Sequence, residues 1–116
     1  MKRLAIIHTT TATVEPLKAL AAELLPGCEV VNFVDDSILP QLSRNGGEVE
    51  AVAGRLKQYA RFACEVGADA VLEACSSVGE VARDMQELVP IPVVRIDSAM
   101  AEQAVRRGAS IGVAAT

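Results

Sequence analysis

The sequence predicts an α/β domain in which a parallel sheet carries helices on both of its faces. Three observations lead to this prediction. Short runs of branched apolar residues, typical of buried strands, alternate along the chain with longer segments whose apolar residues recur every three or four positions. Glycine or proline closes most of these segments. The length of 116 residues suits one domain with a real core, and strands that alternate with helices pair in parallel through right-handed crossovers.

The first two predicted strands are separated by a helix. Leu4–His8 reads LAIIH, a short branched-apolar run that suits a buried strand. The apolar stripe from Val14 to Leu24 predicts a helix, which Pro26-Gly27 closes. Glu29–Val34, with the sequence EVVNFV, is the second predicted strand.

A segment without regular structure is expected before the third strand. Residues 35–47 have no sustained period and are rich in turn formers, so we expect a long connecting loop of the kind that often forms a lid. The helical period returns from Glu48 to Val66, and Gly67 supplies the stop. Asp69–Ala74 is the third predicted strand.

The last part of the chain repeats the same alternation. Apolar residues at three- and four-residue spacing predict a helix over Val78–Leu88, which Pro90 follows closely. Ile91–Ile96, with the sequence IPVVRI, is the fourth predicted strand. A helix over Ser98–Arg107 and a fifth strand over Ser110–Ala115 complete the prediction.

Composition and charge exclude several classes of protein. Hydrophobic residues make up 51% and charged residues 22% of the chain, the balance of a soluble globular protein. A net charge of -4, with no Lys/Arg cluster longer than a pair, argues against nucleic acid as a partner. No apolar run is long enough for a membrane span or a secretion signal, so we expect no membrane partner and a cytoplasmic location. A small solute or another protein chain is the expected partner.

The candidate ligand-binding residues follow the predicted strands. In an open parallel sheet, ligands bind outside the carboxyl ends of the strands, where loops diverge and helix N-termini point at the crevice. Most of the residues there carry a hydroxyl, a thiol or a carboxylate: Thr9, Thr10, Thr11, Asp35, Asp36, Cys75, Ser76, Ser77, Asp97, Ser98 and Thr116. Helix capping is the alternative for each hydroxyl, and Ser77 with Glu80 has capping-box spacing. Capped helix starts can still offer free N–H groups to a carboxylate ligand.

Cys75 differs from the other two cysteines. Cys28 precedes a strand and Cys64 lies within an apolar helix stripe, so both are expected to be small buried hydrophobes. Cys75 follows a strand and faces a helix start, where the helix dipole favours a reactive thiolate. His8 is the sole histidine and is expected to be a hydrogen-bonded structural residue. The odd number of cysteines and the lack of Cys/His spacing argue against a disulfide framework and a metal site, and no nucleotide-binding motif is present.

Three segments together resemble the aspartate/glutamate/hydantoin racemase superfamily: ADAVLEACSS, VPIPVVRIDSAMAEQAV and GASIGVAAT, in this order and spacing. VDDSILPQL is similar to a segment that some uncharacterised members carry after the second strand. The resemblance implies a flavodoxin-like single lobe of a two-lobe racemase fold, with a cofactor-independent active site between the lobes. It implies that one thiolate removes the proton next to the substrate carboxylate and that a second thiol protonates the opposite face.

The resemblance also assigns roles to residues of this chain. Cys75 matches the catalytic cysteine of the first lobe. Ser76, Ser77 and Thr116 match positions that contact the substrate, and the turn with Thr9, Thr10 and Thr11 corresponds to the first loop of the pocket. Ser-Ser replaces the Asn-Thr pair of many members, which leaves related decarboxylases, maleate isomerases and hydantoin racemases open.

The end of the sequence suggests a larger assembly. Thr116 directly follows a predicted strand with no helix to cover it, so we expect residues 109–116 to be the first strand of a second lobe that lies beyond Thr116. An apolar strand at a sheet edge also predicts association with a second lobe or chain, and we expect a homo-oligomer. The leading interpretation is a racemase-like isomerase acting on a small carboxylate. The alternative is a non-catalytic flavodoxin-like binding or dimerisation module.

Overall fold

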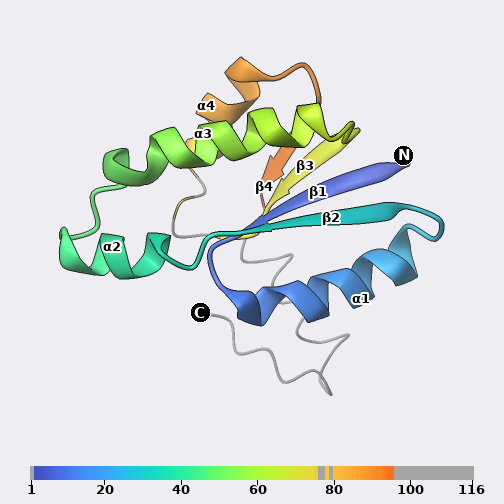
Figure 1. The fold of residues 1–116 in the computed structure, drawn as a ribbon, viewed down its shortest axis with the longest axis horizontal. Helices are drawn as coiled ribbons and strands as arrows, with labels where there is room; N and C mark the ends of the chain where they lie inside the picture. The colour runs from blue at the N-terminus through green and yellow to red at the C-terminus, as the bar shows by residue number, and fades with distance from the viewer. Residues whose placement is uncertain (1, 76–77, 79, 96–116) are drawn as a thin grey trace.

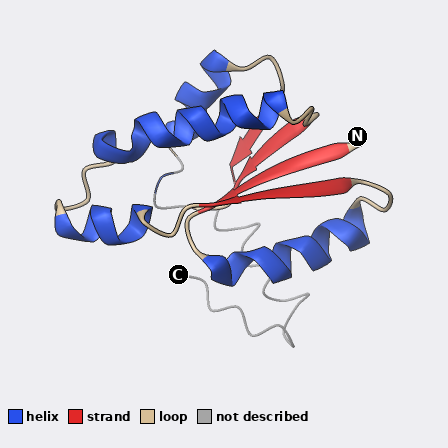
Figure 2. Cartoon of the chain, in the orientation of Figure 1, coloured by secondary structure: helices blue, strands red, loops and turns tan. Residues whose placement is uncertain are grey.

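The computed structural model describes residues 2–75, 78 and 80–95, and in this part of the chain four strands form one parallel sheet with helices on both faces (Figure 1). The alternation of helices and strands is visible in Figure 2. The predicted α/β class is therefore confirmed. The elements are β1 (Arg3–His8), the 3₁₀ helix η1 (Thr11–Thr13), α1 (Val14–Leu24), β2 (Glu29–Val34), α2 (Ile38–Arg44), α3 (Glu50–Glu65), β3 (Ala70–Glu73), α4 (Val81–Leu88) and β4 (Val93–Arg95).

Strand β1 lies inside the sheet, whose order is β2-β1-β3-β4. Leu4 of β1 pairs with Val30 of β2 on one side and with Ala70 of β3 on the other. Both faces of β1 are also covered, and five of its six residues are buried. This position explains the continuous apolar run of the strand, because a strand buried on two faces has no solvent side that would favour alternating polar residues.

Two hydrophobic clusters fill the space between the sheet and its helices. The smaller cluster lies on the α1 face and contains Leu4, Ile6, Leu17 and Ala70. The larger cluster lies on the opposite face, where α2, α3 and α4 pack, and it includes Ala5 and Ile7 of β1. Successive residues of β1 therefore point into the two clusters in turn, because side chains alternate between the faces of a strand. Figure 1 shows α1 on one side of the sheet and α3 with α4 on the other.

The expected loop over residues 35–47 contains a helix, so that prediction was wrong. Helix α2 places Ile38, which is fully buried, four residues before Leu42, which is 8% exposed, and both side chains join the larger cluster. Pro40 lies in the first turn of this helix, where a missing N–H removes no intrahelical hydrogen bond. The segment is too short to show a sustained period, and its proline reads as a turn signal.

Helix α3 and strand β3 lie close to their predicted positions. The buried residues of α3 recur every three or four positions, and Gly67 follows the helix with φ +79°, a conformation that favours glycine. Helix α4 begins at Val81, three residues later than predicted, with Glu80 in the preceding position. Residues 98–107 and 109–116, with their predicted helix, fifth strand and second-lobe boundary, lie outside the described part.

The strand order makes the boundary between β1 and β3 the switch point of the sheet. The chain leaves β1 through α1 to reach β2 on one side, and then crosses through α3 to reach β3 on the other side. The connections that follow β1 and β3 therefore run to opposite faces of the sheet. In open α/β sheets ligands bind at such a switch point, outside the carboxyl ends of the strands.

Candidate functional site

The switch point brings the turn after β1 next to the turn after β3. Ile7 pairs with Glu73 at the end of the ladder, and the backbone N–H of Ala74 donates to the Ile7 carbonyl at 3.0 Å. Thr9 is two residues beyond Ile7, and Cys75 is two residues beyond Glu73. Two of the predicted site residues thus leave the sheet from adjoining strand ends, although they are 66 positions apart in the sequence.

The three threonines after β1 occupy different environments. Thr9 is buried, with 3% of its surface exposed, whereas Thr11 is exposed. Thr10 precedes η1, and its hydroxyl oxygen accepts a hydrogen bond from the Ala12 N–H at 3.3 Å. The capping role considered for these hydroxyls is therefore present at Thr10. Its hydroxyl can still donate one hydrogen bond to a ligand, because an accepting hydroxyl keeps its proton.

Cys75 is a free, partly buried cysteine beside the larger cluster. Its backbone N–H donates to the Glu73 Oε1 atom at 2.9 Å, and its carbonyl accepts from the Val78 N–H at 3.4 Å. Cys64 packs against the same cluster and Cys28 against the smaller one, so both have apolar contacts, but both are partly buried rather than buried as predicted. All three thiols are free and partly buried, so what distinguishes Cys75 is its position at the switch point.

The sequence interpretation missed Glu73. This last residue of β3 has no exposed surface, and its side chain lies on the face that carries Ile7 and the larger cluster. Burial raises the pKa of Glu73 to about 7, although the hydrogen bond from the Cys75 N–H and the positive charge of Arg95 both act to lower it. The available signal was a carboxylate within the otherwise apolar run VLEA, since a charged residue is seldom fully buried without a partner.

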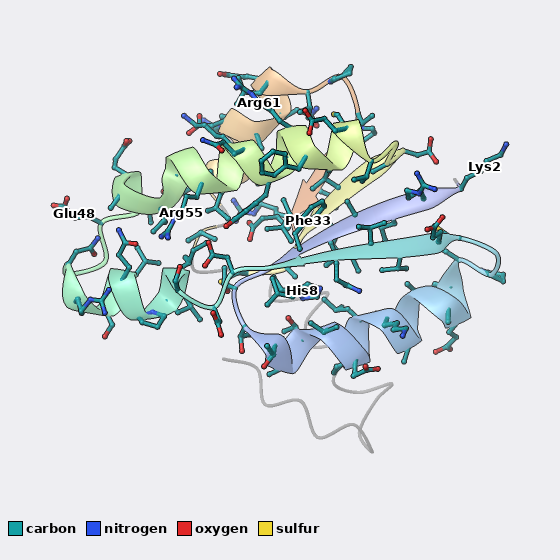
Figure 3. The ribbon with its side chains drawn as sticks, viewed as in Figure 1. Lys2, His8, Phe33, Glu48, Arg55 and Arg61 are labelled. Carbon is teal, nitrogen blue, oxygen red and sulfur yellow. The ribbon has the colours of Figure 1, made fainter. Side chains whose placement is uncertain are left out.

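His8 has the structural role that was predicted for it. The ring lies between the sheet and α1 (Figure 3), with Nδ1 at 2.7 Å from the Thr13 hydroxyl and Nε2 at 2.8 Å from the Asn32 side-chain oxygen. Burial lowers the pKa of His8, and the hydrogen bond to Asn32 partly offsets this effect. Within residues 2–75, 78 and 80–95, no group of histidines, cysteines and carboxylates could hold a metal ion.

A polar network surrounds Asp35, the residue that follows β2. Its carboxylate accepts hydrogen bonds from the backbone and hydroxyl of Ser37 and from the Tyr59 hydroxyl, and the Arg55 guanidinium lies 3.9 Å away. Figure 3 shows Arg55 extending from α3 toward α2, where it also bonds to Gln41 at 2.6 Å. Burial alone would raise the pKa of Asp35, but these hydrogen bonds and the charge of Arg55 hold it below its usual value. Through its contacts with Tyr59 and Arg55, the Asp35 carboxylate links the turn between β2 and α2 to α3.

An open groove of about 930 Å³ lies elsewhere on the molecule, between α3, α4 and β4. Its lining includes Glu50 from α3, Asp84 and Glu87 from α4, and Arg95 from β4. Neither Cys75 nor any of the three threonines lines this groove. The groove and the predicted site are therefore separate features, and the chemistry expected at Cys75 cannot be transferred to the groove.

Several predicted positions lie outside the described part of the chain. These are Ser76, Ser77, Asp97, Ser98 and Thr116. Among the helices that the structure does describe, none has the length and apolar character that crossing a bilayer requires.

Comparison with known proteins places the chain in a family. The family model described as Asp/Glu/Hydantoin racemase matches residues 4–116, which is nearly the whole sequence. A crystal structure of a candidate Asp/Glu racemase from Yersinia pestis superposes with a TM-score of 0.69 at 23% sequence identity, which shows a shared fold. The match covers 93% of this chain and 50% of that one, so this chain spans half the length of its structural relative. No curated protein sequence matches. The chain belongs to the Asp/Glu/hydantoin racemase family.

Proposed function

We propose that this chain is the amino-terminal lobe of a cofactor-independent, racemase-like isomerase that moves a proton at the carbon next to a carboxylate. The observation that supports this most is the position of Cys75, beyond the end of β3 and beside the strand that leads into the Thr9 turn. A switch point is where an open α/β sheet binds its ligand. Family membership favours the same class of reaction.

In the proposed reaction the ionised sulfur of Cys75 removes the proton from the carbon that bears the substrate carboxylate. A new S–H bond forms, and the electron pair of the broken C–H bond stays on the substrate, delocalised into the carboxylate. A second acid on the opposite face, expected as a cysteine of a second lobe, then donates a proton to that carbon. Because such a carbon acid is weak, the site must supply donors where negative charge develops on the carboxylate.

The proposed carboxylate-binding groups are the hydroxyls of six predicted site residues. They are those of Thr9, Thr10, Thr11, Ser76, Ser77 and Thr116. Two described residues support this assignment. The Thr10 hydroxyl accepts a hydrogen bond at the start of η1 and so can still act as a donor, and Thr9 directly follows β1. A small acid bound there would place its α-carbon at the carboxyl ends of the strands. Cys75 follows β3 at this same edge of the sheet.

The proposal is tested by hydrogen exchange in D₂O with the full-length protein and no added cofactor. Proton NMR would follow loss of the α-proton signal for both enantiomers of aspartate and glutamate, for hydantoins and for maleate derivatives. We expect at least one acid to exchange, and Cys75→Ser to reduce the rate by about 100-fold or more, the usual effect of losing a general base. Cys64→Ser is the matched control and should keep the wild-type rate.

Two results would contradict the proposal. Exchange that continues at the wild-type rate in Cys75→Ser would remove the assigned role from this thiol. If no acid exchanges although one of them raises the melting temperature, the chain binds a carboxylate without turning it over. That second result would favour the alternative, a non-catalytic binding module.

A further inference from the structure

Glu73 places a carboxyl group in the interior of the sheet, two residues before Cys75. It pairs in register with Ile7 of β1 and with Arg95 of β4, so strands flank it on both sides. Its residue surface is fully buried. The buried residues that α3 and α4 contribute to this face are apolar, and they include Leu56 and Met85. A carboxyl group therefore stands where the surrounding packing would suit a hydrophobic side chain.

One oxygen of this carboxyl group fixes the backbone of Cys75. Glu73 Oε1 accepts the Cys75 N–H at 2.9 Å, directly after the strand has ended. Without the carboxyl oxygen, this amide would lack the acceptor that a backbone donor near the core needs. The Ala74 N–H still donates to the Ile7 carbonyl, so the Glu73 side chain adds one hydrogen bond directly after the last one between the strands. This bond holds the backbone from which the thiol projects.

The other oxygen, Oε2, is buried and has no hydrogen-bond partner among the described residues. An ionised carboxylate with one unpaired oxygen is unfavourable in an apolar interior, which is why the pKa of Glu73 is raised to about 7. Arg95 on β4 is the charged side chain that opposes this effect. On α3, Arg55 and Tyr59 contact Asp35. Arg83 and Asp84 of α4, together with Glu80 just before it, line the open groove.

We propose that Glu73 is a positioning residue for Cys75, which fixes the backbone of the cysteine through one oxygen and controls the reactivity of the thiol through its own charge. When Glu73 is protonated, the hydrogen bond to the Cys75 amide persists and no negative charge stands beside the thiol. When Glu73 is ionised, its charge opposes formation of a thiolate two residues away. The catalytic meaning of this control rests on the proposed function, but the control itself does not.

The test compares the alkylation of each cysteine in the wild type and in Glu73→Gln. The side-chain amide introduced by this substitution would keep an oxygen to accept the Cys75 N–H but could not ionise. Full-length protein would be treated with iodoacetamide between about pH 5 and about pH 9, and peptide mass spectrometry would give a rate for each cysteine. At about pH 8 we expect Cys75 to react about three to ten times faster in Glu73→Gln, and at about pH 5.5 the two rates should agree within about twofold.

The experiment contains its own controls. Glu65→Gln removes an exposed carboxylate at the end of α3 and should leave the Cys75 profile unchanged. Cys28 and Cys64 should keep their rates in every folded variant. If the Cys75 profile of folded Glu73→Gln coincides with that of the wild type, the proposal is wrong.

A direct titration covers the case in which Glu73→Gln fails to fold. In wild-type protein labelled with ¹³C at the glutamate carboxyl carbon, one resonance should titrate near pH 7. If all glutamates instead titrate below about pH 5.5, the proposal is overturned. Neither measurement uses a substrate. A negative D₂O assay together with the expected alkylation profiles would therefore refute the proposed function and leave the role of Glu73 standing.

Discussion

The hydrogen bond between Tyr59 and Asp35 allows a quantitative prediction of its contribution to the stability of the fold. The Tyr59 hydroxyl donates to the Asp35 carboxylate, which joins α3 to the turn after β2. The Asp35 side chain is only 11% exposed, so solvent screens this contact weakly. A hydrogen bond to a charged group contributes about 1.5–3 kcal/mol to stability. Asp35 keeps Ser37 and Arg55 as partners in Tyr59→Phe, so we expect the coupling free energy between Tyr59 and Asp35 to lie at the lower end of this range, about 1.5–2 kcal/mol.

A double-mutant cycle with Tyr59→Phe and Asp35→Asn measures this coupling directly. The free energies of unfolding would come from urea titrations followed by circular dichroism. Asp36→Asn is the matched control, because Asp36 is the exposed neighbour of Asp35 and should show no coupling to Tyr59. A coupling between Tyr59 and Asp35 below about 0.3 kcal/mol would refute the reasoning, since that is within the error of simple additivity.

The pH dependence of the same contact has a definite sign. The pKa of Asp35 is lowered in the folded protein, so its contribution is complete above the ordinary value of 3.8 and is lost as the pH falls through the folded pKa. Burial and the hydrogen bond to Asp35 raise the pKa of Tyr59 to about 12. The contribution of Tyr59 is therefore complete below pH 10 and disappears between pH 10 and about 12. Tyr59→Phe should lack the alkaline loss, and an unchanged alkaline slope in this variant would contradict the assignment.

Two further predictions concern the cores. Leu56 is fully buried, so Leu56→Ala should lower the free energy of unfolding by about 2–5 kcal/mol in the same urea assay. Leu24 is 54% exposed, so Leu24→Ala should lower it by less than about 1 kcal/mol. Equal losses in the two variants would contradict the placement of Leu56 in the core. Because the pKa of His8 is lowered from 6.5, the unfolded chain binds a proton more readily than the folded one, and stability should decline as the pH falls from 6.5 toward the folded pKa. His8→Gln should remove that part of the decline in urea unfolding measured from about pH 8 to about pH 5, and a variant with the wild-type slope would count against it.

The strands and the long helices could be predicted because their signals are local. The run LAIIH predicts a buried strand by itself, and the stripe through Val52, Leu56 and Ala63 predicts α3. Helix α2 was missed because two buried residues, Ile38 and Leu42, are too few to establish a period. The partner that stabilises α2 is α3, and no local pattern could show that contact.

The site was only partly predictable for a related reason. Cys75 and Thr9 could be selected, because both follow predicted strands and the carboxyl ends of parallel strands lie at one edge. Glu73 was missed because its position within an apolar run suggests only a strand residue. Its importance depends on burial and on the hydrogen bond to the Cys75 amide, which are properties of the folded chain.

The central position of β1 also determines when the site can form during synthesis. A ribosome makes β1 and β2 early, but the other edge of β1 stays open until Ala70–Glu73 has been translated. Contacts between such distant segments form late, because closing a long loop costs entropy before any pairing compensates for it. A nascent chain that ends before β3 contains Thr9 but not Cys75, so it exposes the unpaired edge of β1 and lacks half of the candidate site.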